Sequence, residues 1–169
     1  MTNRKVVIGV MGPGEGSTKS DLYRAYQLGQ LIARQGWVLL TGGRKAGVME
    51  AASIGAKDAG GLTIGILPSN NTRSLCEAVD LAIITDMGNA RNNINVLSSD
   101  AIIACGTGIG TASEIALGLK NGKKVVLLTD NRETQSFFTS LSPENVYLAT
   151  NPKDAVELVK KILSSLSSQ

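Results

Sequence analysis

A glycine-rich segment carrying hydroxyl and carboxylate side chains occupies residues 105–114, with the sequence Cys-Gly-Thr-Gly-Ile-Gly-Thr-Ala-Ser-Glu. It follows a short apolar run and leads into a helix-like pattern. The first N–H groups of a helix are unpaired and partly positive, and glycine lets the backbone approach a ligand closely. Thr107 and Thr111 add hydroxyl donors, and Glu114 lies one turn into the helix. The segment therefore predicts a pocket for a phosphorylated small molecule.

A second glycine-rich segment, Met-Gly-Pro-Gly-Glu-Gly-Ser-Thr at residues 11–18, follows the first apolar run of the chain. Its spacing does not match the GxGxxG pattern of dinucleotide-binding folds, and it lacks the Gly-Lys-Ser/Thr of a P-loop. A turn followed by a helix that is capped at Ser17 or Thr18 explains the segment as well as a ligand contact does. Both interpretations of this loop stay open at this point.

The third glycine-rich segment is Thr-Gly-Gly-Arg-Lys-Ala-Gly-Val-Met at residues 41–49. Paired glycines after a strand favour a close approach between the backbone and a ligand. Arg44 and Lys45 could neutralise an anion, but charged loop residues are more often solvated. We therefore predict that both side chains are loop charges in contact with water.

Residues 87–95 combine one arginine with four asparagines close to a predicted helix start. Asparagine favours caps and turns, so a structural role explains Asn89. Arg91 carries a planar, permanently charged guanidinium that suits phosphate or another oxyanion, with a surface salt bridge as its alternative role. We predict that Arg91 and Asn92 belong to the pocket.

The two cysteines and the absence of histidine narrow the possible chemistry. Without histidine the chain cannot carry a Ser-His-Asp or Cys-His catalytic group or a histidine-based zinc site. Cys76 and Cys105 are too few for a disulfide scaffold or a four-cysteine zinc site, so we predict no metal ligands. Cys105 is expected to be a small core residue rather than a reactive thiol. Cys76 lies in a helix-like stretch and is given no role.

Composition indicates a single globular domain over residues 1–169, with a polar tail at 164–169 that is expected to fray. Hydrophobic residues make up 43% of the chain and charged residues 18%, which is an ordinary globular balance. A net charge of +3 and a 4% share of aromatic residues do not favour nucleic-acid binding. The chain shows no signal peptide and no membrane-length apolar run, which predicts a cytoplasmic protein without a membrane partner.

Short apolar runs alternate with amphipathic patterns along the chain, and this alternation predicts the fold class. Strands are expected at residues 6–11, 37–40, 63–67, 81–84, 101–104, 125–128 and 146–148. Helices are expected at residues 21–34, 48–59, 89–97, 111–119 and 152–163. This order is typical of a doubly wound α/β fold, with a mainly parallel sheet covered by helices on both faces. Ligands in such folds bind at the carboxyl ends of the strands, near a topological switch point.

Several of these residues together resemble the superfamily of "Lonely Guy" (LOG) proteins, which are Rossmann-like phosphoribohydrolases that activate cytokinins. The resemblance is carried by the glycines at 42–43, Gly-Val-Met at 47–49, Arg91, and Gly-Ile-Gly-Thr-Ala-Ser-Glu at 108–114. The superfamily signature is PGGxGTxxE, together with an upstream Met-x-x-Arg-Lys. The matching positions in the glycine-rich part are Gly110, Thr111 and Glu114. The positions that depart from the signature are Gly106, Thr107, Asn92 and, one residue too early, Met87.

Longer strings in the chain resemble the family of molybdenum cofactor carrier proteins within that superfamily. These strings lie at residues 8–14, 36–44, 90–95 and 137–141 and reach across nearly the whole chain. The resemblance implies a cytosolic homotetramer that binds and protects molybdenum cofactor for later transfer to molybdoenzymes. That cargo is an anionic phosphorylated pterin whose dithiolene already holds the metal. A pocket made of hydrogen-bond donors, without metal ligands, suits such a cargo.

The predicted binding residues come from the three glycine-rich segments and the asparagine-rich helix start. They are Gly12, Gly14, Ser17, Gly42, Gly43, Arg91, Asn92, Gly106, Thr107, Gly108, Gly110, Thr111 and Glu114. The alternative is an enzyme that hydrolyses the N-glycosidic bond of AMP or a cytokinin riboside 5′-monophosphate, with Arg91 and Glu114 as its catalytic residues. The departures from the hydrolase signature favour the carrier, which is not an enzyme.

Overall fold

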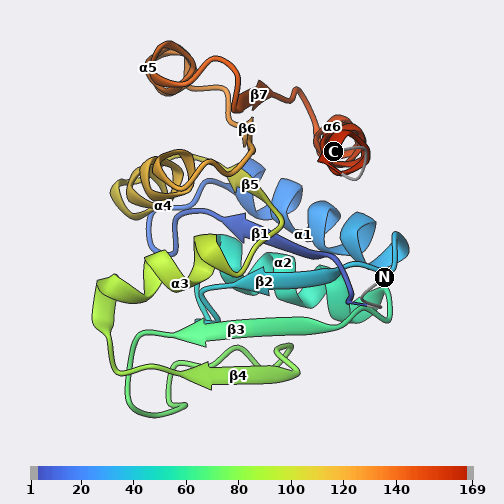
Figure 1. The fold of residues 1–169 in the computed structure, drawn as a ribbon. Coiled ribbons are helices and arrows are strands. Elements are labelled where there is room, and N and C mark those ends of the chain that lie inside the picture. Colours follow the sequence, from blue (N-terminus) through green and yellow to red (C-terminus); the bar gives the residue numbers. More distant parts are fainter. Residues whose placement is uncertain (1–3, 167–169) are drawn as a thin grey trace.

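A seven-stranded, all-parallel sheet forms the centre of the molecule, in a computed structural model that describes residues 4–166 (Figure 1). The strand order across the sheet is β4-β3-β2-β1-β5-β6-β7. The strands are β1 (Val7–Met11), β2 (Val38–Thr41), β3 (Thr63–Leu67), β4 (Leu81–Ile84), β5 (Ala101–Cys105), β6 (Val125–Leu128) and β7 (Val146–Leu148). The helices are α1 (Lys19–Arg34), α2 (Gly47–Asp58), α3 (Arg91–Leu97), α4 (Ile109–Lys120), α5 (Arg132–Leu141) and α6 (Pro152–Leu166), with a short 3₁₀ turn at Gly88–Ala90.

The chain reverses its direction across the sheet next to β1, which creates the switch point of a doubly wound fold. From β1 the chain moves outward through β2 and β3 to the edge strand β4, then returns to β5 on the other side of β1. The loops that follow β1 and β5 consequently diverge and leave a crevice at the carboxyl ends of these strands. This arrangement confirms the predicted Rossmann-like α/β fold.

Helices lie on both faces of the sheet, and each face has its own hydrophobic core. Helices α1, α2 and α6 cover one face, whereas α3, α4 and α5 cover the other (Figure 1). Ile8 and Val10 of the central strand pack into the first core, and Met11 packs into the second. All three side chains are almost completely buried, and burial of a side chain of this size contributes about 1.5–3 kcal/mol.

Helices cover both faces of the sheet as predicted, but this coverage is incomplete at the β4 edge. Leu81, Ile83 and Ile84 of this strand are each about half exposed. The connection from β3 to β4, residues 68–80, contains no helix that could cover the edge. The apolar sequence of the strand does not itself distinguish a covered central strand from an open edge.

Two helices differ from the sequence prediction. Helix α5 was not predicted, because its sequence Arg-Glu-Thr-Gln-Ser-Phe-Phe-Thr-Ser-Leu is largely polar. The Asn131 side chain caps this helix by accepting a hydrogen bond from the N–H of Thr134. Helix α6 continues to Leu166, so residues 164–166 are helical rather than part of a frayed tail. The rest of the predicted tail, residues 167–169, lies outside the described residues.

Within residues 4–166, none of the helices is long and apolar enough to cross a membrane. The same residues bring together no group of three or more Cys, Asp or Glu side chains that could hold a metal ion.

Candidate functional site

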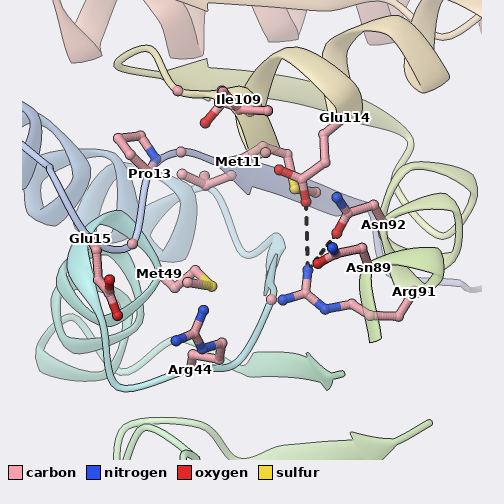
Figure 2. A pocket seen from close by; sticks show the side chains of 17 residues that line it. Met11, Pro13, Glu15, Arg44, Met49, Asn89, Arg91, Asn92, Ile109 and Glu114 are labelled. Carbon is pink, nitrogen blue, oxygen red and sulfur yellow. Dashed lines mark hydrogen bonds and ion pairs between the residues drawn. The ribbon is translucent and has the colours of Figure 1, made fainter. Parts of the chain in front are cut away.

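A cavity of about 210 Å³ lies at the switch point, between the loops that follow β1, β2 and β5 and the start of α3 (Figure 2). Its position matches the expected edge of the sheet, because all three loops leave the carboxyl ends of neighbouring parallel strands. The predicted binding residues that line the cavity are Gly12, Gly14, Gly42, Arg91, Asn92, Gly108, Gly110, Thr111 and Glu114.

Two glycines create the space in which the cavity forms. A methyl group at Gly12 would lie 2.4 Å from the carbonyl oxygen of Cys105 and 2.5 Å from Cγ1 of Val48. A methyl group at Gly42 would lie 2.7 Å from Nη2 of Arg91 and equally close to the Met49 sulfur. Larger residues at these positions would therefore push apart the walls of the cavity.

The first backbone N–H groups of α4 lie at the cavity and have no hydrogen-bond acceptor within the helix. Gly108 precedes the helix in an extended conformation, and no side chain caps the first turn. The Thr111 side chain is 2% exposed, and its Oγ1 has no hydrogen-bond partner among the described residues. Because buried hydroxyls are normally paired, this group indicates a position that a ligand is suited to fill.

A buried network joins α3 to α4 at the base of the cavity. Oε1 of Glu114 accepts a hydrogen bond from Nδ2 of Asn95 at 3.0 Å, and it lies 3.7 Å from Nη1 of Arg91. Nη1 of Arg91 also donates to Oδ1 of Asn92 at 2.9 Å. Nε of Arg91 and Oδ1 of Asn95 have no partner within residues 4–166. The guanidinium thus keeps capacity to bind an additional acceptor.

The charges of this network are strongly affected by burial. Desolvation raises the pKa of Glu114 to about 7, although the Asn95 hydrogen bond and the positive charge of Arg91 both act in the opposite direction. Desolvation also lowers the pKa of Arg91. The negative charge of Glu114 acts in the opposite direction, whereas the nearby positive charge of Arg44 lowers this pKa further. Near neutral pH, the pocket therefore contains a carboxyl group that readily changes its charge.

Arg44 also lines the cavity, which corrects its interpretation as a solvated loop charge. Figure 2 shows its guanidinium beside Met49, on the opposite side of the cavity from Glu114. Among the described residues, the guanidinium has no ion-pair or hydrogen-bond partner. Lys45, by contrast, is exposed and lies 3.3 Å from Glu77, as expected for a solvated charge.

The segment between β3 and β4 holds the Arg44 loop in place. The N–H of Lys45 donates to the carbonyl oxygen of Ser74 at 2.7 Å, and the N–H of Cys76 donates to that of Gly43 at 2.9 Å. These contacts are non-local, so the orientation of Arg44 could not be read from its own neighbours in the sequence. The other lining residues that sequence reasoning missed are Val10, Met11, Pro13, Glu15, Met49, Asn89 and Ile109.

Four predicted binding residues lie outside the lining of this cavity and support its loops instead. Ser17 Oγ donates to the carbonyl oxygens of Pro13 and Gly14 at 2.6 and 2.9 Å. The remaining three are Gly43, packed on Gly65; Gly106, packed on the Asp21 carboxyl; and Thr107, hydrogen-bonded to Thr129. Gly43 and Gly106 have φ values of 74° and 82°, a conformation that favours glycine for backbone reasons alone.

The helix caps in the structure show which polar residues have the capping role that the sequence left open. Thr18, not Ser17, caps α1, in a reciprocal pair of hydrogen bonds with Asp21. Asn89 does not cap α3: it lies in the 3₁₀ turn and lines the cavity.

Cys105 is fully buried, and burial raises the pKa of its thiol to about 12, which agrees with a core role. Cys76 is buried in an irregular segment, so its predicted helical setting is wrong.

Comparisons with known proteins identify close relatives of this fold. A family model described as the SLOG cluster4 family matches residues 5–156. The molybdenum cofactor binding protein from Rippkaea orientalis is 62% identical, with a TM-score of 0.95 over 96% of this chain and 99% of that one. The molybdenum cofactor carrier protein from Chlamydomonas reinhardtii is 50% identical, with a TM-score of 0.91 over 95% and 99% of the two chains.

A more distant relative carries a different function in its name. A cytokinin riboside 5′-monophosphate phosphoribohydrolase from Rhodococcoides fascians is 36% identical over 131 residues. The match covers 70% of this chain and 64% of the hydrolase.

Proposed function

Because this chain belongs to the SLOG cluster4 family, we propose that it binds molybdenum cofactor, protects it and hands it on as a carrier protein. The proposal is supported by two solved structures, named as a molybdenum cofactor binding protein and a molybdenum cofactor carrier protein, that match this chain over nearly its entire length. The hydrolase relative is less similar and matches a smaller part of the chain.

The observation that carries the proposal is the unpaired donor set of the cavity. Thr111 Oγ1 and Arg91 Nε are buried without acceptors, and the first turn of α4 has no side-chain cap. The cofactor is an anionic pterin with a terminal phosphate and oxo groups on its metal. Phosphate suits the uncapped N-terminus of α4 and Thr111, whereas Arg91 and Arg44 suit anionic oxygens. The Asn92 amide lines the cavity, accepting from Arg91 and donating to Ser113, and its second amide hydrogen suits the pterin edge.

An anaerobic binding measurement with the purified protein tests this proposal. We expect saturable binding of molybdenum cofactor without release of free base from AMP or from cytokinin riboside 5′-monophosphates. Failure to bind the cofactor at any concentration would refute the carrier function.

A phosphoribohydrolase is the second candidate, because Arg91 and Glu114 meet in the cavity at 3.7 Å and the hydrolase relative is 36% identical. In that reaction Arg91 orients the nucleotide, and Glu114 stabilises the oxocarbenium-like ribose or activates water. Release of free base that disappears in Glu114→Ala, without specific cofactor binding, would establish the hydrolase and exclude the carrier.

The oligomeric state, the recipients and the cellular location also belong to this proposal. The resemblance implies a cytosolic homotetramer that supplies molybdoenzymes. Apolar side chains exposed on and near β4 support an interface between copies of the chain. These exposed side chains are Leu81, Ile83, Ile84 and Met87.

A further inference from the structure

A carboxyl group lies at the base of a cavity whose hydrogen-bond donors suit anions, and its negative charge would oppose the binding of an anion. The Glu114 side chain is 8% exposed, and Figure 2 shows its carboxyl group directed toward Arg91 inside the cavity. A negatively charged ligand placed beside Arg91 would meet this carboxylate in a poorly solvated space, where like charges repel strongly. The repulsion disappears if the carboxyl group is neutral.

The charged groups around Glu114 come from each element that surrounds the cavity. Helix α3 contributes Arg91, the loop after β2 contributes Arg44, and the loop after β1 contributes Glu15. Glu15 is exposed, so water screens its charge, whereas Arg91 and Glu114 are buried together. Arg91 is thus the cation that a ligand and Glu114 must share.

The geometry shows that neighbouring groups stabilise the ionised form of Glu114 only weakly. Its distance of 3.7 Å from Arg91 Nη1 exceeds a normal hydrogen bond, and Asn95 Nδ2 is the closest donor at 3.0 Å. Oδ1 of Asn95 has no donor among the described residues. A half turn of the Asn95 amide would let a protonated Glu114 donate to this oxygen, so the network also accommodates the neutral acid.

We propose that Glu114 takes up a proton from solvent when an anionic ligand binds beside Arg91, and that it thereby selects for ligands according to their charge. The inference rests on the proposed anion-binding function of the same cavity. The proton moves from buffer to a carboxyl oxygen of Glu114, no covalent bond of the ligand changes, and Arg91 transfers its interaction from Glu114 to the ligand. Glu114 is a positioning residue in this role.

The direction of the pH effect follows from the charge of the free site. Burial already raises the pKa of Glu114 to about 7 without a ligand, and a bound anion raises the pKa further. Below this pKa Glu114 already carries the proton in the free protein. Above this pKa Glu114 must take up a proton from solvent when the anion binds, and this uptake lowers the observed affinity. Affinity therefore falls by about tenfold between about pH 6 and about pH 8.

Sulfate is the decisive probe, because its charge does not change over this range, whereas a phosphate monoester titrates near pH 6. Isothermal titration calorimetry in two buffers with different ionisation enthalpies counts the protons taken up. For sulfate at about pH 8 we expect uptake approaching one proton per site and about tenfold weaker binding than at about pH 6. In Glu114→Gln we expect no uptake and an affinity that is independent of pH. Glu133→Gln, which removes an exposed carboxylate outside the cavity lining, is the matched control and keeps the wild-type uptake.

Infrared difference spectroscopy of the wild-type protein gives a second readout that does not depend on the folding of any variant. Ligand addition at about pH 8 should produce the C=O band of a neutral carboxylic acid. Binding without this band and without proton uptake, or uptake that persists in Glu114→Gln, would overturn the role of Glu114. If sulfate is not bound, molybdenum cofactor is titrated instead, and uptake by its own phosphate is subtracted with Glu114→Gln. A protein that binds neither ligand refutes the proposed function itself.

Discussion

Unpaired polar atoms at individual residues carry most of the functional argument. Thr111 Oγ1 and Arg91 Nε are buried beside the cavity without acceptors, and Arg44 adds a second guanidinium on the opposite wall. Such groups lower stability unless a ligand satisfies them, so they link ligand affinity to single side chains. Two substitutions, one at Thr111 and one at Arg44, test this link.

Replacement of Thr111 by valine keeps the shape of the side chain but removes the unpaired hydroxyl. We expect the affinity for inorganic phosphate to fall about tenfold, because a hydrogen bond to a charged group contributes roughly 1.5–3 kcal/mol. The stability of the free protein should stay equal or rise. Thr139→Val is the matched control, because its Oγ1 is also buried and unpaired but lies outside the cavity lining. Calorimetric titration and thermal unfolding measure both effects, and unchanged phosphate affinity in Thr111→Val would contradict the assignment.

Arg44 and Lys45 are adjacent cations in different environments. We expect Arg44→Met to lower the affinity for an anionic ligand by about tenfold or more, because a charge facing a poorly solvated cavity interacts strongly with an anion. Lys45→Met should change affinity by less than about twofold, because exposed ion pairs such as that with Glu77 contribute little. Equal losses in the two variants, measured with phosphate at one ionic strength, would show that Arg44 acts only through net charge.

The pH dependence of stability reports on Glu114 without any ligand. Its pKa is raised by burial from 4.5 to about 7, so the folded protein holds the proton more tightly than the unfolded chain. The contribution of this group to the stability of the wild-type protein is therefore greatest below about pH 4.5, and it is lost as pH rises toward about 7. Urea unfolding of Glu114→Gln should lack this slope. Identical slopes in both proteins would assign the titration to another residue.

At the scale of elements, close packing between α1 and α2 positions two walls of the cavity. The loop after β1 leads into α1 and the loop after β2 leads into α2, so the spacing of these helices affects both loops. A methyl group at Gly29 would lie 2.0 Å from the carbonyl oxygen of Ala52, and one at Gly55 would lie 2.0 Å from that of Tyr26. Small residues thus allow the two helix backbones to approach each other.

Gly29→Ala tests this contact. We expect it to destabilise the protein by about 1–3 kcal/mol, because backbone atoms of α2 must move to admit the methyl group. Gly110→Ala in the first turn of α4 is the control, because nothing lies within 4 Å of its position and alanine favours a helix by up to about 1 kcal/mol. Urea unfolding midpoints compare the two variants. A Gly29→Ala protein as stable as the wild type would mean that the helices separate at little cost.

At the scale of the whole molecule, the β4 edge of the sheet is incompletely covered. The β4 edge exposes apolar side chains of the strand itself and of Met87, three residues after its end. An apolar parallel edge strand favours pairing or burial against another surface. An assembly of identical chains would cover this edge.

Substitution of Ile83 by lysine tests the proposed assembly. We expect the wild-type protein to have the mass of a homotetramer in light scattering, and Ile83→Lys to have a smaller mass at about micromolar concentration, because a charge on an edge strand opposes burial. Tyr23→Lys is the control, because this exposed side chain lies on α1 at the other face of the sheet. A monomeric wild-type protein would exclude the tetramer.

Local patterns were sufficient to predict most of the fold. The strands at 63–67, 81–84 and 125–128 have the predicted boundaries, because short apolar runs between turn residues are a local signal. Helix α5 was missed because its sequence is largely polar, although its apolar residues recur with helical spacing. The open β4 edge could not be predicted, because exposure depends on which elements pack against a strand rather than on its own sequence.

The sequence by itself determined the fold class, the glycine-rich loops, and the presence of Arg91, Thr111 and Glu114 at one edge of the sheet. It did so because glycine conformations, helix starts and apolar runs are properties of neighbouring residues. The tertiary structure alone decided that Arg44 lines the cavity, that Ser17 and Thr107 lie outside its lining, and that the pKa of Glu114 is raised to about 7. Those outcomes depend on burial and on contacts between segments far apart in the chain, which no local pattern encodes.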